Sequence, residues 1–149
     1  MKAMLFLAAG AFIYGTGARK LSELKGIGHT MPIPTIAFCI GGFSMVGIPI
    51  TSGVISKWYL TLGALDVGRP FFTAVILISS LLNGIYYLPI VVNAFFSKPE
   101  EAVAEPKQLP RQMLVPLTLL SIGVIFFGIF PSLILGIVYR AAQLLLGLS

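Results

Sequence analysis

One lysine, Lys57, lies within the strongly apolar stretch "ITSGVISKWYLTLG", which runs from Ile50 to Gly63. A charge in hydrocarbon is costly, and charges inside membrane segments usually face the bundle interior and mark ion pathways. Because a buried lysine readily changes its pKa, it can gain or lose a proton near neutral pH. The sequence therefore indicates Lys57 as a proton-relay residue. The alternative is a side chain that reaches the membrane interface, a setting that its neighbours Trp58 and Tyr59 also favour.

Other polar residues in the apolar regions are candidates for a supporting role. Lys2 opens the first apolar block and is a second candidate relay residue, although by itself it has the character of an ordinary N-terminal charge. Ser79, Ser80 and Asn83 lie within about one helical turn of one another, and Ser56 precedes Lys57. These side chains could hold water, or they could form hydrogen bonds between helices and back to the backbone.

The chain offers little for chemistry of its own. Its only cysteine, Cys39, cannot form an internal disulfide, and its only histidine, His29, has no partner at metal-ligand spacing. We find no nucleophile-base-acid set, no phosphate-binding loop and no cofactor fingerprint. The sequence therefore predicts no metal and no cofactor in this chain. Any redox chemistry would belong to partner subunits, which leaves open whether the chain is part of an enzyme.

The composition indicates a membrane protein. The chain has 149 residues, of which 57% are hydrophobic and 10% are charged, and its mean hydropathy is +0.98. Soluble domains have about a quarter charged residues, and a chain this short cannot explain the deficit by a larger core. The net charge is +5, but the basic residues do not form a helix face that would bind nucleic acid. Basic residues that flank membrane segments account for it better.

The apolar residues form four blocks. They cover residues 3–18, residues 31–56 with a continuation at 58–65, residues 71–97 and residues 112–139. We expect an all-α, polytopic membrane helix bundle with about four to five transmembrane helices, one of them discontinuous. Residues 1–149 would form a single membrane domain with a solvent loop at 97–111, and Pro89, Pro116 and Pro131 are candidates for kinks. The first block also has the pattern of a secretory signal peptide.

The second block contains its own helix break. The stretch "GGFSMVGIPITSG" includes Gly47, Pro49 and Gly53, and proline disfavours helix at the residue before it. We therefore predict two elements, at about 33–48 and 50–65. Interrupted membrane segments are the best sequence indication of an ion site in transporters, and Lys57 follows this break.

The helix count also predicts which basic residues share a side of the membrane. One set is Arg19, Lys20, Lys25, Arg69 and Arg140, and the other is Lys98, Lys107 and Arg111. The small excess of basic residues in the first set favours a cytoplasmic position for it, and the orientation stays open.

Four segments carry a resemblance to a known family. They are "KAMLFLAAGAFI", "LSELKGIGHTMP", "GGFSMVGIPITSGVISKWYL" and "LLNGIYYLPIVVNAFF", and together they cover most of the chain. In order and spacing they resemble the antiporter-like subunits of respiratory complex I, of membrane-bound hydrogenases and of Mrp cation/proton antiporters. The "SKWYL" form is most similar to the D-type Mrp subunit. The resemblance implies that the first block is a membrane helix, and the family's topology would place the loop near Arg19 outside.

The resemblance also implies roles for the two lysines. Lys57 falls at the family's lysine on a discontinuous helix, in the second of two inverted half-channels, where it passes protons toward the exit side. Lys2 falls at the lysine on the preceding helix, in a central polar axis. The chain matches only the C-terminal part of the family, so the first half-channel is absent. This implies a larger complex in the inner (cytoplasmic) membrane, with a partner chain that supplies the missing N-terminal helices. The alternative is a structural, non-conducting subunit of such a complex.

Overall fold

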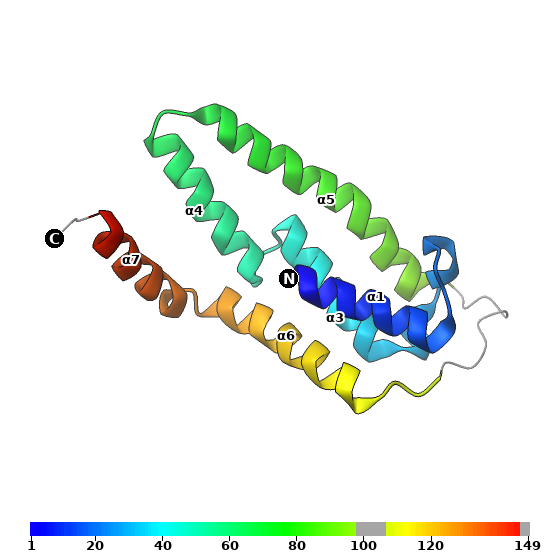
Figure 1. Cartoon of the computed structure of the whole chain (residues 1–149). Coiled ribbons are helices and arrows are strands. Elements are labelled where there is room, and N and C mark those ends of the chain that lie inside the picture. Colours follow the sequence, from blue (N-terminus) through cyan, green and yellow to red (C-terminus); the bar gives the residue numbers. More distant parts are fainter. Residues whose placement is uncertain (98–106, 147–149) are drawn as a thin grey trace.

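The computed structural model describes residues 1–97 and 107–146, and within these ranges the chain is entirely helical (Figure 1). The elements in chain order are α1 (Lys2–Thr16), the 3-10 helix η1 (Leu21–Leu24), α2 (Ile27–Thr30), α3 (Pro32–Val46), α4 (Ser52–Asp66), α5 (Pro70–Phe96), α6 (Arg111–Ile129) and α7 (Ser132–Leu146). The predicted all-α fold is confirmed.

Proline and glycine set several of the helix boundaries. Pro32 and Pro70 stand in the first turns of α3 and α5, where a missing N–H costs nothing. Gly17 and Gly47 end α1 and α3 in the left-handed conformation, at φ 75° and 94°. The two predicted elements of the second block therefore exist as α3 and α4, with boundaries close to those expected.

Small residues allow α1, α3 and α6 to pack closely. Ala8 of α1 and Ala37 of α3 lie in one buried cluster with Leu117 of α6. At Gly41 of α3, an added Cβ would come within 2.8 Å of the Leu5 side chain. Helices that meet in lipid commonly have such small residues at their interface, because these residues let the backbones approach.

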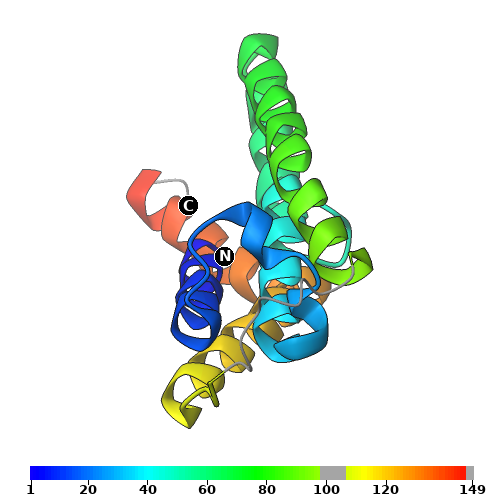
Figure 2. The ribbon, with the colours of Figure 1, turned by 90° about the vertical axis from the view of Figure 1, so that its right-hand side faces the viewer.

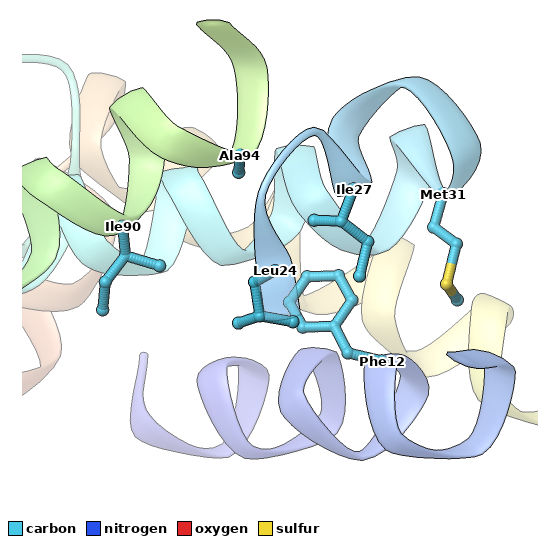
Figure 3. Close-up of a cluster of buried hydrophobic side chains, with 6 residues drawn as sticks. All are labelled: Phe12, Leu24, Ile27, Met31, Ile90 and Ala94. Atoms are coloured by element: carbon cyan, nitrogen blue, oxygen red, sulfur yellow. The ribbon is translucent and has the colours of Figure 1, made fainter. Parts of the chain in front are cut away.

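A second buried cluster joins the loop after α1 to the end of α5 (Figure 3). Its members are Phe12, Leu24, Ile27, Met31, Ile90 and Ala94. The Gly26 N–H donates to the Asn93 carbonyl oxygen at 3.0 Å, and His29 Nε2 lies 3.1 Å from the Phe95 carbonyl oxygen. The loop is thereby fixed against the last turns of α5.

Two of the helices in the described ranges are long and apolar enough to cross a membrane by themselves, α5 and α6. The most apolar part of α5 is only 11% buried within the chain. The helices α1, α3 and α7 are apolar but shorter. Much of the apolar surface of α5 must therefore face lipid or other protein.

The predicted sidedness of the basic residues is wrong. The Lys107 N–H donates to the Gly15 carbonyl oxygen at 3.0 Å, so Lys107 lies at the same end of the bundle as Arg19. The α4–α5 turn, which holds Arg69, lies at the opposite end (Figures 1 and 2). The reason is that α3 and α4, each about 22 Å long at 1.5 Å per residue, together make one passage across the bundle rather than two.

The last apolar block is also divided. A continuous segment from 112 to 139 was expected, but α6 ends at Ile129 and α7 begins at Ser132. Pro131 lies between them, so its effect is a break and not a kink within one helix. By contrast, α5 and α6 continue through Pro89 and Pro116. Most of the expected solvent loop at 97–111 lies outside the described residues.

Candidate functional site

The ammonium group of Lys57 lies at the junction between α3 and α4. Lys57 is in the second turn of α4, and its Nζ donates to the carbonyl oxygens of Met45 at 2.6 Å and Val46 at 3.0 Å. Its third partner is Ser80 Oγ of α5, at 2.7 Å. An ammonium has three N–H donors, and here each has an oxygen acceptor. The half-buried side chain thus connects α3, α4 and α5.

The end of α3 is a favourable place for a cation. The last carbonyls of a helix have no partner within it, and the C-terminus carries a partial negative charge. The Lys57 ammonium faces the carbonyls of the last two residues of α3. Among residues 1–97 and 107–146, no ion pair joins Lys57 to a carboxylate. Backbone dipoles and a hydroxyl therefore stabilise the charge. The ammonium reaches back to the helix break and not toward the far end of α4.

The backbone between α3 and α4 leaves space for the Lys57 side chain. A Cβ at Gly47 would lie 3.3 Å from Lys57 Cδ and would require an unfavourable φ of +94°. Pro49 is exposed in the turn that follows. Ile50 has φ 81°, which for a β-branched residue stores about 1–3 kcal/mol of strain. The Thr51 hydroxyl donates to the Ile48 carbonyl oxygen at 2.8 Å and closes the turn.

Gly53 lies within α4 and not in the break itself. Its N–H donates to Ser44 Oγ at 3.1 Å, and an added Cβ would overlap the Ser44 carbonyl oxygen. From the other side, a Cβ at Gly128 of α6 would overlap the Ile50 carbonyl oxygen. The break is therefore held by backbone contacts from two sides. Gly128 was not among the predicted site residues, and its position within an apolar helix was the only signal in the sequence.

Of the predicted polar support residues, only Ser80 reaches Lys57. Its hydroxyl also donates to the Ile76 carbonyl oxygen at 3.0 Å. Ser79 is exposed and Asn83 is half-buried, and neither contributes a hydrogen bond to Lys57 in the described parts of the chain. Ser56 donates to the Ser52 carbonyl oxygen at 3.3 Å, within its own helix.

Lys2 stands apart from Lys57 but beside the same part of α3. It is exposed at the start of α1 and, with Arg19 and Lys20, lines a mainly apolar cavity of about 420 Å³. Met45 borders this cavity as well, and its carbonyl oxygen is the closest acceptor of Lys57. Lys2 and Met45 thus line one cavity that does not include Lys57, while the Met45 carbonyl oxygen accepts from Lys57.

In the described ranges, no group of three or more His, Cys, Asp or Glu side chains could hold a metal ion. Cys39 is buried among apolar neighbours on α3, with 6% of its surface exposed. The His29 side chain contacts the end of α5.

Residues 1–83 match the family described as NADH:quinone oxidoreductase/Mrp antiporter, TM. The chain belongs to this family. The matched region contains Lys2, the helix break, Lys57 and Ser80. The prediction of an antiporter-like, multi-pass membrane protein is confirmed.

Individual relatives agree with this assignment. The chain is 37% identical over 154 aligned residues to "NADH-quinone oxidoreductase subunit N" of Desulforudis audaxviator, an alignment that covers 95% of this chain and 31% of the relative. It is 26% identical to "F(420)H(2) dehydrogenase subunit N" of Methanosarcina mazei, over 97% of this chain and 31% of that protein. The chain spans about a third of the length of these relatives.

A solved structure shares the fold. The chain resembles a chain in the "Structure of Mrp complex from Dietzia sp. DQ12-45-1b", with a TM-score of 0.78 and 26% identity. The match covers 90% of this chain and 33% of the other. Relatives thus include both respiratory and Mrp proteins, and the greater similarity to the D-type Mrp subunit stays a prediction.

Proposed function

We propose that this chain is part of a proton-translocating or Na⁺/H⁺-translocating antiporter-like module in a larger membrane complex, with Lys57 as its proton relay. The observation that carries the proposal is the position of the Lys57 ammonium at the junction of two short helices. There it has three oxygen partners on α3 and α5. Family membership supports the same function.

The type of partner suits a group that must change its charge. A lysine paired with a buried carboxylate would leave that carboxylate uncompensated after losing its proton, which is strongly unfavourable. The partners of Lys57 are two carbonyls and a hydroxyl, all of them neutral. Loss of the proton therefore leaves no unpaired charge behind. This favours a lysine that works in both the charged and the neutral form.

Lys2 is proposed as the second relay residue. It lines the cavity that Met45 also borders, and Met45 provides an acceptor for Lys57. Water molecules in that cavity would connect Lys2 to the segment of α3 whose carbonyl oxygen binds Lys57. Arg19 and Lys20 line the same cavity and give it a positive potential, which disfavours the entry of free cations.

The proposed partners are other membrane subunits, including a chain or a chain segment that supplies further N-terminal helices. The chain aligns with about a third of its relatives, and the apolar surface of α5 is mostly uncovered. The proposed location is the inner (cytoplasmic) membrane. We propose that this chain binds no cofactor and that redox chemistry, where the complex has it, belongs to the partner subunits.

The test is ion transport by the assembled complex in vesicles. We expect the Lys57→Met substitution to abolish transport, whereas Lys25→Met, which alters an exposed loop lysine, leaves transport unchanged. Measuring the pH gradient with and without Na⁺ distinguishes the two coupling ions. Full transport by the Lys57→Met complex would contradict the proposal.

A second candidate function is structural, and the same hydrogen bonds favour it. Lys57 satisfies the last carbonyls of α3 and links them to α5, so it could serve only to hold the broken helix together. In that case Lys57→Met would reduce the amount of assembled complex, but transport per assembled complex would stay normal. Comparing native-gel yield with transport per complex separates the two functions.

A further inference from the structure

The geometry points to Ser80 as a positioning residue that lets Lys57 keep all of its hydrogen bonds in both the charged and the neutral form. This inference rests on the proposed relay function and adds a second residue to it. Ser80 is the only side chain among the three partners of Lys57, since the other two are backbone carbonyls of α3.

The need for Ser80 follows from counting donors and acceptors. A lysine ammonium has three N–H donors and no acceptor. The neutral amine has two N–H donors and one lone pair, so one of the three partners must then become a donor. The carbonyl oxygens of Met45 and Val46 can only accept. The hydroxyl of Ser80 can both donate and accept. It is therefore the one partner that can change from acceptor to donor when Lys57 loses its proton.

The hydroxyl proton of Ser80 has a second position available to it. It is now donated to the Ile76 carbonyl oxygen, one turn earlier in α5, at 3.0 Å. Such bonds from serine to the preceding turn are local and readily exchanged. After Lys57 loses its proton, rotation of the hydroxyl brings the Ser80 proton to Nζ. The Ile76 carbonyl keeps its place in the helix ladder.

The proton that Lys57 loses is the one it donates to Ser80 Oγ, and it goes to a water molecule beside Ser80. Ser80 then turns its own proton from the Ile76 carbonyl oxygen to Nζ, so that it neither gains nor loses a proton in the completed step. Ser80 lies in a shallow groove between the end of α3 and α5, whose other lining residues, such as Val46, Gly84 and Leu88, are apolar. Its hydroxyl is therefore the one polar group in the lining of this groove, and a water molecule that reaches the helix junction would hydrogen-bond to it. We assign to that water the role of proton acceptor.

Other titratable groups on the packed elements do not replace Ser80. The helices α3, α5 and α6 contact α4. The titratable or charged groups in their described parts are Cys39, Tyr86, Tyr87 and Arg111. Besides Lys57, α4 itself carries Tyr59 and Asp66. Within the described residues, none of these side chains is hydrogen-bonded or ion-paired to Lys57. The response of Lys57 to pH should therefore depend on Ser80.

The test compares Ser80→Ala, Ser80→Thr and the matched control Ser79→Ala in the assembled complex. Ser79 is the exposed neighbour of Ser80 on the same helix. We measure transport per complex across a range of pH, together with the yield of complex on native gels. Ser80→Ala removes a hydrogen bond from both forms of Lys57, and the bond to the charged form is the stronger of the two. Transport should therefore fall several-fold, and the alkaline limb of the profile should move by about one pH unit toward lower pH.

We expect this effect in Ser80→Ala, its restoration in Ser80→Thr, and a wild-type profile in Ser79→Ala. A Ser80→Ala profile equal to wild type, or a loss that threonine does not restore, would overturn the inference. If either result occurs while Lys57→Met abolishes transport, the relay function stands and the role of Ser80 alone is wrong. Normal transport by Lys57→Met would instead contradict the relay function itself.

Discussion

Replacement of Gly53 by alanine should loosen the helix junction that holds Lys57. The Cβ of the Gly53→Ala variant would overlap the Ser44 carbonyl oxygen and come within 2.9 Å of Ser44 Oγ. The carbonyl oxygen belongs to the backbone and cannot turn aside, so α4 must move away from α3. That movement also weakens the hydrogen bond from the Gly53 N–H to Ser44 Oγ. The hydrogen bonds of Lys57 to α3 depend on the same contact.

Gly63→Ala is the matched control for the size of this effect. Gly63 lies in the same helix, and no atom lies within 4 Å of its added Cβ. Both substitutions gain helix propensity, up to about 1 kcal/mol each. The difference between them therefore isolates the packing conflict, which costs about 1–3 kcal/mol. For a chain of this size, the two midpoints of thermal unfolding should differ by about 2–12 °C.

The assay is loss of the chain from the purified complex after heating, followed on native gels. We expect Gly53→Ala to be lost at a lower temperature than wild type, and Gly63→Ala at an equal or higher temperature. Equal midpoints for the two variants would show that α3 and α4 do not meet at Gly53, which would refute the close backbone contact at the helix break.

Two further predictions concern the other side of the break and the loop after α1. Gly128→Ala should destabilise the complex by about 1–3 kcal/mol, because its Cβ would overlap the Ile50 carbonyl oxygen. Gly123→Ala is the control and should not destabilise it, because its Cβ has open space. The same heating assay compares the two variants, and equal midpoints would contradict the contact at Gly128. The amide N–H groups of Arg19 and Lys20 hold the pKa of the Glu23 carboxyl below its ordinary value of 4.5. A lowered pKa gives stability that is present above the ordinary value and is lost as pH falls through the folded value. The protection of these two amides, which is their exchange rate relative to the intrinsic rate at the same pH, should therefore fall in acid for the wild type. An equal loss of protection in Glu23→Gln would refute this.

The position of the helix break could be predicted from the sequence because its causes are local. Pro49 cannot continue a helix, and Gly47 supplies the left-handed φ that ends α3. The family could also be recognised, since its motifs are contiguous stretches. Lys57 was identified because a charge in an apolar run is rare whatever the fold.

The partners of Lys57 and the course of the chain could not be predicted in the same way. Ser80 is 23 residues from Lys57, and only the packing of α5 against α4 selects it over Ser79. The predicted membrane sides of the basic residues were wrong, because hydropathy does not show that α3 and α4 together cross the bundle only once. The close backbone contacts at Gly53 and Gly128 depend on distances between helices, which a single sequence does not show.

The proposed relay function requires that Lys57 changes its protonation state under working conditions. This change can be observed in the ¹⁵N chemical shift of Lys57 Nζ in the assembled complex across the pH range of transport, with the signal assigned by its disappearance in Lys57→Arg. We predict that the signal changes from ammonium to neutral amine within that range. A signal that stays that of an ammonium at every pH at which the complex transports ions would contradict the relay function.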